Sequence, residues 1–378
     1  MHYDSDWRNL VKHLISGQVP SNHEAHQHVP GPDGPSRRGV FSIAIICALP
    51  LEYDAVSLLF DESWDEQDGG YGRAAGDTNT YSFGRVGRHN VVLVLLPNMG
   101  SSVAAGSAAS LRSSFPSLSL ALLVGVCGGV PGTGADERLL GDVVISKIVY
   151  HDISKQYPAS LVLRDTVEDA LGRPKKEIRN LVTIFETEAG EEQLQTKAGS
   201  HLQELQARAV RLNRRTNYHY PGVDEDKLFA ADYRHGHHEP QLCVICNEGP
   251  QGSCRTAAQA SCTELGCDER RLVPRTRIEM RRRMAPEDQQ RPRVIIGSIS
   301  SGNIVMKSGE HRDQIAQERG VVAFEMEGAG VWDEVPCIVV KGICDYADSH
   351  KNKVWQPFAA AAAAAVTKAV LGRHACTD

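Results

Sequence analysis

Long hydrophobic runs are missing from this chain of 378 residues, and no segment reaches the roughly 20 uninterrupted apolar residues needed to cross a bilayer. The first residues also lack the apolar core of a secretory signal peptide. We therefore expect an intracellular, cytoplasmic protein with no membrane partner. The formal net charge of −6 lacks the basic excess of a general nucleic-acid binder, so no nucleic-acid partner is expected. A small anionic ligand stays open.

Dinucleotide and P-loop signatures are absent as well. The glycine-rich string 125–129 matches neither G-x-G-x-x-G nor the Walker A pattern. Hydrophobic residues make up 41% of the chain and charged residues 23%, which is ordinary for a globular protein with a substantial core. These common nucleotide-binding motifs therefore do not define its function.

Cysteines are too sparse for a disulfide framework, since ten are spread over a long chain and five lie in one segment. Cys243 and Cys246 have the C-x-x-C spacing of metal ligands. The later spacing is irregular and defines no unique fourth ligand, so a structural zinc, reduced thiols and a disulfide all stay open. Other candidate ligands nearby are His235, His237, His238, Cys254, Cys262 and Cys267.

The organisation along the chain predicts one α/β domain. Residues 1–39 are rich in His, Pro, Gly and Ser and are expected to form a flexible arm, and residues 40–378 form the predicted catalytic domain. Continuous apolar runs alternate with helix-compatible stretches, which predicts a three-layer mixed sheet flanked by helices. The runs are 41–49, 91–96, 120–124, 142–145, 293–296 and 337–340, and the stretches are 103–111, 312–318 and 325–332.

Two further segments stand out. Residues 155–290 are charged, then rich in cysteine and arginine, and are predicted to be a large insertion in the core domain. Residues 355–371 contain seven consecutive alanines flanked by larger apolar residues, which predicts a closing helix packed on the sheet. The arginine run 281–283 is expected to be solvated surface.

Two acidic strings, 324–328 (Phe-Glu-Met-Glu-Gly) and 342–348 (Gly-Ile-Cys-Asp-Tyr-Ala-Asp), follow late apolar runs. With segments 43–52, 125–152 and 301–306, in this order, they resemble the nucleoside phosphorylase superfamily. Within it the chain resembles the methylthioadenosine/S-adenosylhomocysteine nucleosidases and phosphorylase-like domains of fungal proteins. The resemblance covers about 41–150 and 294–371. It implies cleavage of a purine N-glycosidic bond without redox cofactor or catalytic metal, a small-molecule purine ligand and a homo-oligomer.

Three carboxylates take catalytic roles by this resemblance. Cleavage builds positive charge on the sugar and negative charge on the purine, so an acid near the base and anionic groups near the sugar assist it. Asp345 matches the acid facing purine N7, which requires a pKa raised by burial or a neighbouring carboxylate. Glu327 matches the glutamate that holds the ribose 2′- and 3′-hydroxyls. Glu52 matches the residue that orients the attacking water, whereas Glu325 is interpreted as a structural neighbour.

Binding residues follow from the same alignment of motifs. Met326 matches the residue beneath the sugar, and Lys341 the basic residue near water and ribose. Val305 and Met306 stand where an aromatic residue would face adenine. The glycine turn adds Cys127 and Gly128 to the candidates. A 5′-phosphate could be faced by Arg88, and by Arg85, His89, Lys307, Arg312, Arg275, Arg277 and the run 281–283.

The absence of phosphate-binding residue types favours water as the nucleophile. Phosphorylases of the superfamily bind phosphate with arginines and a hydroxyl, because arginine suits bidentate oxyanion recognition. Leu123 and Val126 stand at the matching places here, and 47–52 contains no basic residue. The favoured function is a purine nucleosidase that releases adenine, from a nucleoside or from a nucleotide up to ATP. The alternatives are a phosphate-dependent purine nucleoside phosphorylase and a non-catalytic nucleotide-binding sensor.

Overall fold

The structure is a computed structural model that describes residues 34–35, 37–64, 71–151, 154–157, 160–163, 171, 174–238, 243–247, 254–351 and 353–375. Nearly all of the predicted arm, 1–39, lies outside these residues, apart from a short 3₁₀ turn, η1 (Arg38–Val40). The proposed boundaries of arm, domain and insertion stay predictions.

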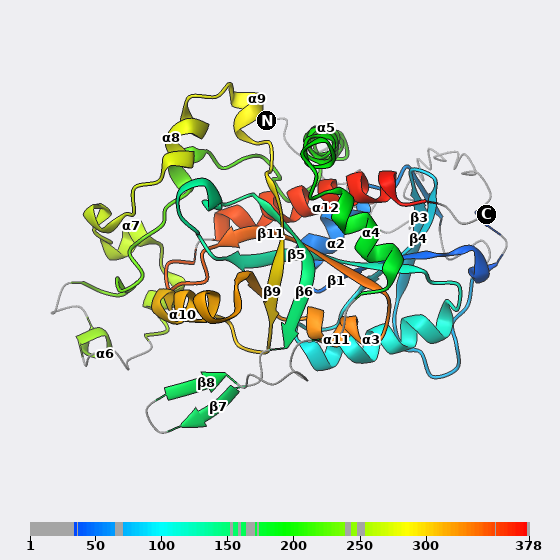
Figure 1. Cartoon of the computed structure of the whole chain (residues 1–378), viewed down its shortest axis with the longest axis horizontal. Helices are drawn as coiled ribbons and strands as arrows, with labels where there is room; N and C mark the ends of the chain where they lie inside the picture. The colour runs from blue at the N-terminus through cyan, green and yellow to red at the C-terminus, as the bar shows by residue number, and fades with distance from the viewer. Residues whose placement is uncertain are drawn as a thin grey trace, which may run out of the picture. The chain divides into compact units, whose positions relative to one another are not determined.

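Nine strands of the described part form one mixed sheet in the order β10-β9-β6-β11-β5-β1-β4-β3-β2 (Figure 1). The apolar runs become its central strands, since β1, β5 and β11 are buried along almost their whole length. The three-layer mixed α/β fold predicted from the sequence is therefore confirmed. The strands are β1 (Ile43–Cys47), β2 (Glu62–Trp64), β3 (Tyr81–Val86), β4 (His89–Leu95), β5 (Leu120–Gly129), β6 (Val143–His151), β9 (Val294–Ser301), β10 (Val321–Glu325) and β11 (Cys337–Asp345).

The direction of the strands determines where the acidic strings meet. β1, β4, β5 and β11 are parallel, so their carboxyl ends lie at one edge of the sheet. β10 pairs in parallel with β9, and its residues Ala323 and Phe324 also pair with Gly129 and Gly128 at the end of β5. This second pairing curls the sheet and brings the end of β10 beside the ends of β5 and β11.

Helices cover both faces of the sheet (Figure 1). α2 (Pro50–Ser57) and α12 (Gln356–Arg373) pack on one face, with α5 (Glu188–Arg211) across α12. α3 (Ser101–Ser114) and α11 (Gly328–Trp332) pack together on the other face, and α10 (Gly309–Arg319) lies against β10.

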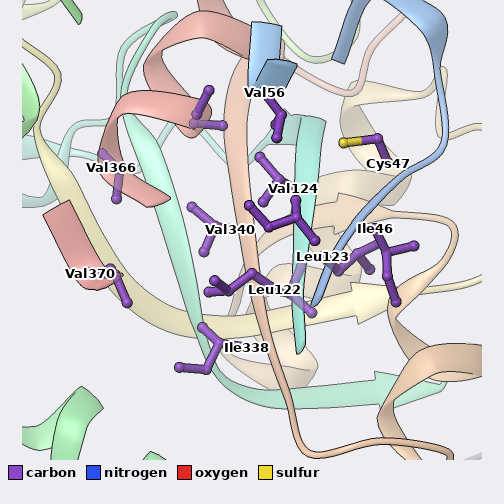
Figure 2. Packing of buried hydrophobic residues seen from close by; sticks show 14 of the residues in the cluster. Ile46, Cys47, Val56, Leu122, Leu123, Val124, Ile338, Val340, Val366 and Val370 are labelled. Atoms are coloured by element: carbon purple, nitrogen blue, oxygen red, sulfur yellow. The ribbon is translucent and has the colours of Figure 1, made fainter. Parts of the chain in front are cut away.

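The predicted closing helix is α12. Its seven consecutive alanines, 359–365, are each at most 1% exposed, and a Cβ on Gly342 of β11 would lie 2.1 Å from the carbonyl oxygen of Ala359. Small residues on both elements thus allow the helix backbone to approach the strand closely, while Val366 and Val370 face apolar residues of β5 and β11 (Figure 2). Residues 353–373 are long and apolar enough to cross a membrane by composition, but 78% of the apolar 18-residue window within them is buried inside the protein, as in a core helix.

The region between β6 and β9 contains a hairpin and several helices. It holds β7 (Ser154–Tyr157), β8 (Ser160–Leu163), α4 (Lys176–Ile184), α5, α6 (Val244–Asn247), α7 (Cys262–Leu265), α8 (Thr276–Arg282) and α9 (Pro286–Gln289). The expectation that the run 281–283 is solvated is wrong for Arg281, which is 6% exposed. Its guanidinium lies 3.0 Å from Asp142 and is buried because this ion pair compensates its charge.

Candidate active site

The candidate site lies at the carboxyl ends of the parallel strands, where α/β sheets commonly bind ligands. Glu52 occupies the first turn of α2, directly after β1. Lys341 lies within β11, and Asp345 ends that strand. Glu325 ends β10, and Glu327 is the N-cap residue of α11. The helix expected over 325–332 therefore begins only at Gly328, and its first predicted turn is the corner that carries the acids.

Lys341 is the centre of a buried charge cluster. Its ammonium lies 3.1 Å from Glu327 Oε2 and 3.7 Å from Glu325 Oε2, and all three side chains are at most 5% exposed. Burial alone would lower the pKa of Lys341, but the charges of Glu327, Glu52 and Glu325 outweigh it and hold this pKa well above its usual value. Lys341 is therefore a permanent cation among three carboxyl groups.

Glu52 is held rigidly by the backbone. Its Oε2 accepts hydrogen bonds from the N–H groups of Ala48 and Leu49, each at 2.9 Å, and its Oε1 accepts one from Val126 at 2.8 Å. Gly125 leaves room for this carboxylate, because a Cβ there would lie 2.2 Å from Oε1. Burial raises the pKa of Glu52, against the opposing effect of Lys341 and of the N–H donors. A raised pKa makes the carboxylate a stronger base.

Glu327 and Glu325 differ in their surroundings. Glu327 Oε1 accepts a weak hydrogen bond of 3.3 Å from the N–H of Gly100, the N-cap of α3, and its Oε2 faces Lys341. Glu325 instead accepts the N–H groups of Glu327 and Gly328 at 2.9–3.0 Å, so it caps α11. Burial raises the pKa of Glu325. This geometry matches the interpretation of Glu325 as a structural neighbour.

Asp345 has an unexpected partner in Lys351. The Lys351 ammonium lies 3.0 and 3.1 Å from its two carboxylate oxygens, and the N–H of Ala347 donates to Oδ1 at 2.8 Å. Gly128 of β5 lies directly beside it, since a Cβ there would come within 3.0 Å of Oδ1. The assigned role requires Asp345 to be buried or to lie beside another carboxylate, whereas the structure places the Lys351 ammonium beside it. No sequence signal marked Lys351, which reaches Asp345 only because 346–350 forms a turn.

A buried clamp holds the residue after this acid. The Tyr346 hydroxyl lies 2.6 Å from Asp226 Oδ1 and contacts Arg275, and the Tyr346 carbonyl accepts a 2.8 Å hydrogen bond from Arg312. Burial, with the charge of Asp226, holds the pKa of Tyr346 well above its usual value. Arg275 and Arg312 therefore position the strand end rather than offering open cations to a phosphate.

The other predicted residues are placed unevenly. Cys127 and Gly128 end β5 next to Asp345, and burial raises the pKa of the Cys127 thiol. Met326 is half-buried between the two glutamates, Met306 is half-buried, and Val305 is 47% exposed in the loop after β9. Arg88 is not brought to the site. It precedes β4 at the opposite edge of the parallel strands and donates to the carbonyl of His374.

Most of the other basic candidates are held in ion pairs. Arg277 and Arg281 both bind Asp142, Arg282 binds Asp224 and Glu279, and Arg85 binds Glu62. A pocket of about 590 Å³ opens next to the site, between the ends of β1 and β4. None of the described residues that line it is charged: they are Ala48, Leu49, Pro50, Tyr53, Thr80, Leu95, Leu96, Pro97, Asn98 and Met99.

Comparison with known proteins gives distant relatives. No family model matches the chain. Among solved structures, a methylthioadenosine/S-adenosylhomocysteine nucleosidase of Colwellia psychrerythraea in complex with adenine is similar at a TM-score of 0.48 and 16% identity, over 89% of this chain and 96% of that one. A futalosine hydrolase of Helicobacter pylori is similar at a TM-score of 0.47 and 14% identity, over 88% and 98%.

A curated relative is a nucleotide-binding leucine-rich repeat (NLR)-like protein of Hyaloscypha variabilis, 29% identical over 344 residues. The match covers 88% of this chain but only 29% of that protein's length.

Proposed function

We propose that this protein hydrolyses the N-glycosidic bond of a purine nucleoside or nucleotide, with adenine as the favoured base and water as the nucleophile. The observation that carries the proposal is the position of Glu52, held by three backbone N–H groups in the same buried cluster as Lys341 and Glu327. A carboxylate fixed in this way can orient a water molecule and accept its proton.

The charges of the site favour water over phosphate. Glu52 takes up the N–H groups of Ala48, Leu49 and Val126, which an oxyanion would otherwise use. Lys341 is shared among three carboxyl groups, so a phosphate dianion would meet excess negative charge rather than a cation of its own. A phosphorylase would need N–H groups and a cation that are open to phosphate.

Glu327 and Asp345 take the two ends of the substrate. Within the described part of the chain, Glu327 Oε1 accepts one hydrogen bond, of 3.3 Å, so this oxygen can accept the ribose hydroxyls and stabilise the cationic sugar. Asp345, with Lys351, faces the leaving purine, where the ammonium stabilises the negative charge that develops on the base. In this proposal Asp345 takes up a proton from solvent as the purine displaces part of the Lys351 contact, and it then donates that proton, or a hydrogen bond, to N7.

The uncharged pocket favours a nucleoside with a neutral 5′ group. It adjoins Glu52 through Ala48 and Leu49, and it adjoins Gly100, the donor to Glu327, through Met99. A triphosphate would meet no charged residue among its described lining. AMP and ATP remain substrates to be tested. Intracellular location and a homo-oligomeric state remain predictions from sequence.

The test compares wild-type protein with Asp345→Asn and Glu52→Gln on adenosine, methylthioadenosine, guanosine, AMP and ATP, with base and sugar products separated by chromatography. We expect adenine and free ribose from the wild type without phosphate. Both variants should lose 10²-fold or more in rate, the order of acid–base contributions. Base release at wild-type rate in Asp345→Asn contradicts the assigned acid, and tight binding of all substrates without cleavage contradicts the enzymatic function.

A further inference from the structure

Four side chains of the segment 237–254 bring metal-binding atoms together. His237, Cys243, Cys246 and Cys254 each offer one donor atom, and these four atoms all lie within 4.8 Å of one another. The Cys243 and Cys254 sulfurs are 3.7 Å apart, and His237 Nδ1 lies 3.3 Å from Cys246 Sγ and 3.9 Å from Cys254 Sγ. Cys243 precedes α6, Cys246 lies within it, and His237 and Cys254 lie before and after it in the chain, so one short stretch supplies all four donors.

These separations are those of a tetrahedral zinc shell. With Zn–S about 2.3 Å and Zn–N about 2.05 Å, tetrahedral geometry places two sulfurs about 3.8 Å apart and a sulfur and a nitrogen about 3.6 Å apart. A disulfide would require about 2.05 Å between sulfurs, and the nine cysteines that the structure describes form none. Backbone N–H groups of His237 and Ala257 point at Cys246 and Cys254, at 3.5 and 3.4 Å, as donors to metal-bound thiolates do.

A second group lies beside the first. His235 Nδ1 is 3.6 Å from Cys262 Sγ and 3.5 Å from Cys267 Sγ. The other ring nitrogen, Nε2, lies 2.9 Å from the carbonyl oxygen of Ala260. A carbonyl oxygen can only accept a hydrogen bond, so Nε2 carries a proton. In the neutral ring the lone pair is then on Nδ1 and faces the two sulfurs, as a metal-ligating histidine requires.

We infer that this segment binds two zinc ions. One is held by His237, Cys243, Cys246 and Cys254 in a closed shell, which is the composition of structural zinc sites. The other is held by His235, Cys262 and Cys267, with a fourth position for water or another ligand. Borderline-soft zinc suits this donor set of imidazole and thiolate better than magnesium or calcium, which prefer oxygen.

The second ion would brace the loop next to the candidate active site. The backbone N–H of His235 donates to Ser349 Oγ at 3.0 Å, and the His235 ring packs edge-on against His350 at 5.3 Å between centroids. Ser349 and His350 directly precede Lys351, the partner of Asp345. Zinc would therefore order 346–351 through His235, whatever reaction the site performs.

The test is metal content of the full-length, tag-free protein, purified without added metal and measured by plasma mass spectrometry. We expect two zinc ions per chain in the wild type, one in His237→Asn, and one in Cys267→Ser. His238→Asn is the matched control for His237→Asn, because His238 is its neighbour but instead bonds to Tyr233. Cys337→Ala, in β11, is the cysteine control, and both controls should keep two ions.

Two readouts separate metal loss from misfolding. Circular dichroism should show that the variants are folded. Wild-type protein stripped of metal by a chelator should show thiolate charge-transfer absorption when Co²⁺ is added, and this absorption should be about half as strong in His237→Asn. Hydrogen exchange at 346–351 should accelerate in Cys267→Ser. Wild-type protein without zinc, whether its thiols are reduced or bridged, overturns the inference, as does equal zinc loss in His237→Asn and His238→Asn. If the wild type holds a single zinc ion that is lost in His237→Asn and kept in Cys267→Ser, the second site is overturned.

Discussion

Replacing Lys341 by methionine removes the one cation shared by Glu52, Glu325 and Glu327. At an effective dielectric constant of about 20, its separations of 3.1 Å and 3.7 Å from Glu327 and Glu325 correspond to about 4–5 kcal/mol each before desolvation. Loss of the ammonium also removes its burial penalty. Breaking a buried pair from one side typically costs about 3–5 kcal/mol, and we expect that loss in unfolding free energy at pH 7.5.

The loss should depend on pH with a defined sign. Burial already raises the pKa values of Glu52 and Glu325 in the folded protein, while Lys341 lowers them. A carboxyl group with a raised folded pKa contributes stability below the unfolded value of about 4.3 and loses it as pH rises through the folded pKa. Without Lys341 these pKa values rise further. The deficit of Lys341→Met should therefore grow from pH 5 to pH 7.5.

Urea unfolding of both proteins at several pH values measures this deficit. Lys368→Met is the matched control, since Lys368 pairs with Asp61 at 2.8 Å with side chains 19% and 39% exposed. Such a pair contributes about 0–1 kcal/mol. A Lys341→Met deficit no larger than that of the control, or one that is constant between pH 5 and pH 7.5, would refute the buried-cluster reasoning.

The remaining predictions concern catalysis and backbone space. Gly125→Ala should lower kcat at least tenfold, measured by adenine release, because its Cβ would lie 2.2 Å from Glu52 Oε1 and displace the base. Gly106→Ala is the control, because its Cβ would lie on an exposed helix face with no atom within 4 Å. It should stabilise the protein by about 0.5–1 kcal/mol and leave kcat unchanged. An equal loss of kcat in both variants would contradict the reasoning. Glu327→Gln should lower kcat/KM on adenosine about 10- to 100-fold, because a charged hydrogen bond contributes about 1.5–3 kcal/mol. The loss should be smaller on 2′,3′-dideoxyadenosine, which lacks the hydroxyls and keeps only the effect on the cationic sugar; the same loss on both substrates would remove the hydroxyl-binding role.

The sequence predicted the sheet and its closing helix because buried parallel strands and an alanine-rich helix have strong local signals. The apolar runs became β1, β4, β5, β6, β9 and β11, and the seven consecutive alanines lie within α12. The acidic strings also located the corner where Glu325 and Glu327 lie. These features depend on residues close in sequence.

Partners that a turn or the folded chain brings together could not be predicted. Lys351 reaches Asp345 across a turn, and Asp142 binds Arg277 and Arg281 from more than a hundred residues away. The proposed ligand set around Cys243 and Cys246 was ambiguous because several His and Cys residues lie near this pair, and spacing alone does not select His237 and Cys254 among them. Ion pairs and metal ligands of this kind are chosen by the folded chain, not by spacing.

Isotope tracing of the sugar product tests the central claim most directly. Adenosine and methylthioadenosine would be incubated with the wild-type protein in H₂¹⁸O containing phosphate, and the released sugar analysed by mass spectrometry. Hydrolysis predicts free adenine and a sugar that carries ¹⁸O at C1 in amounts independent of phosphate, with rate lost in Glu52→Gln. Ribose 1-phosphate without ¹⁸O at C1, formed only when phosphate is present, would contradict it.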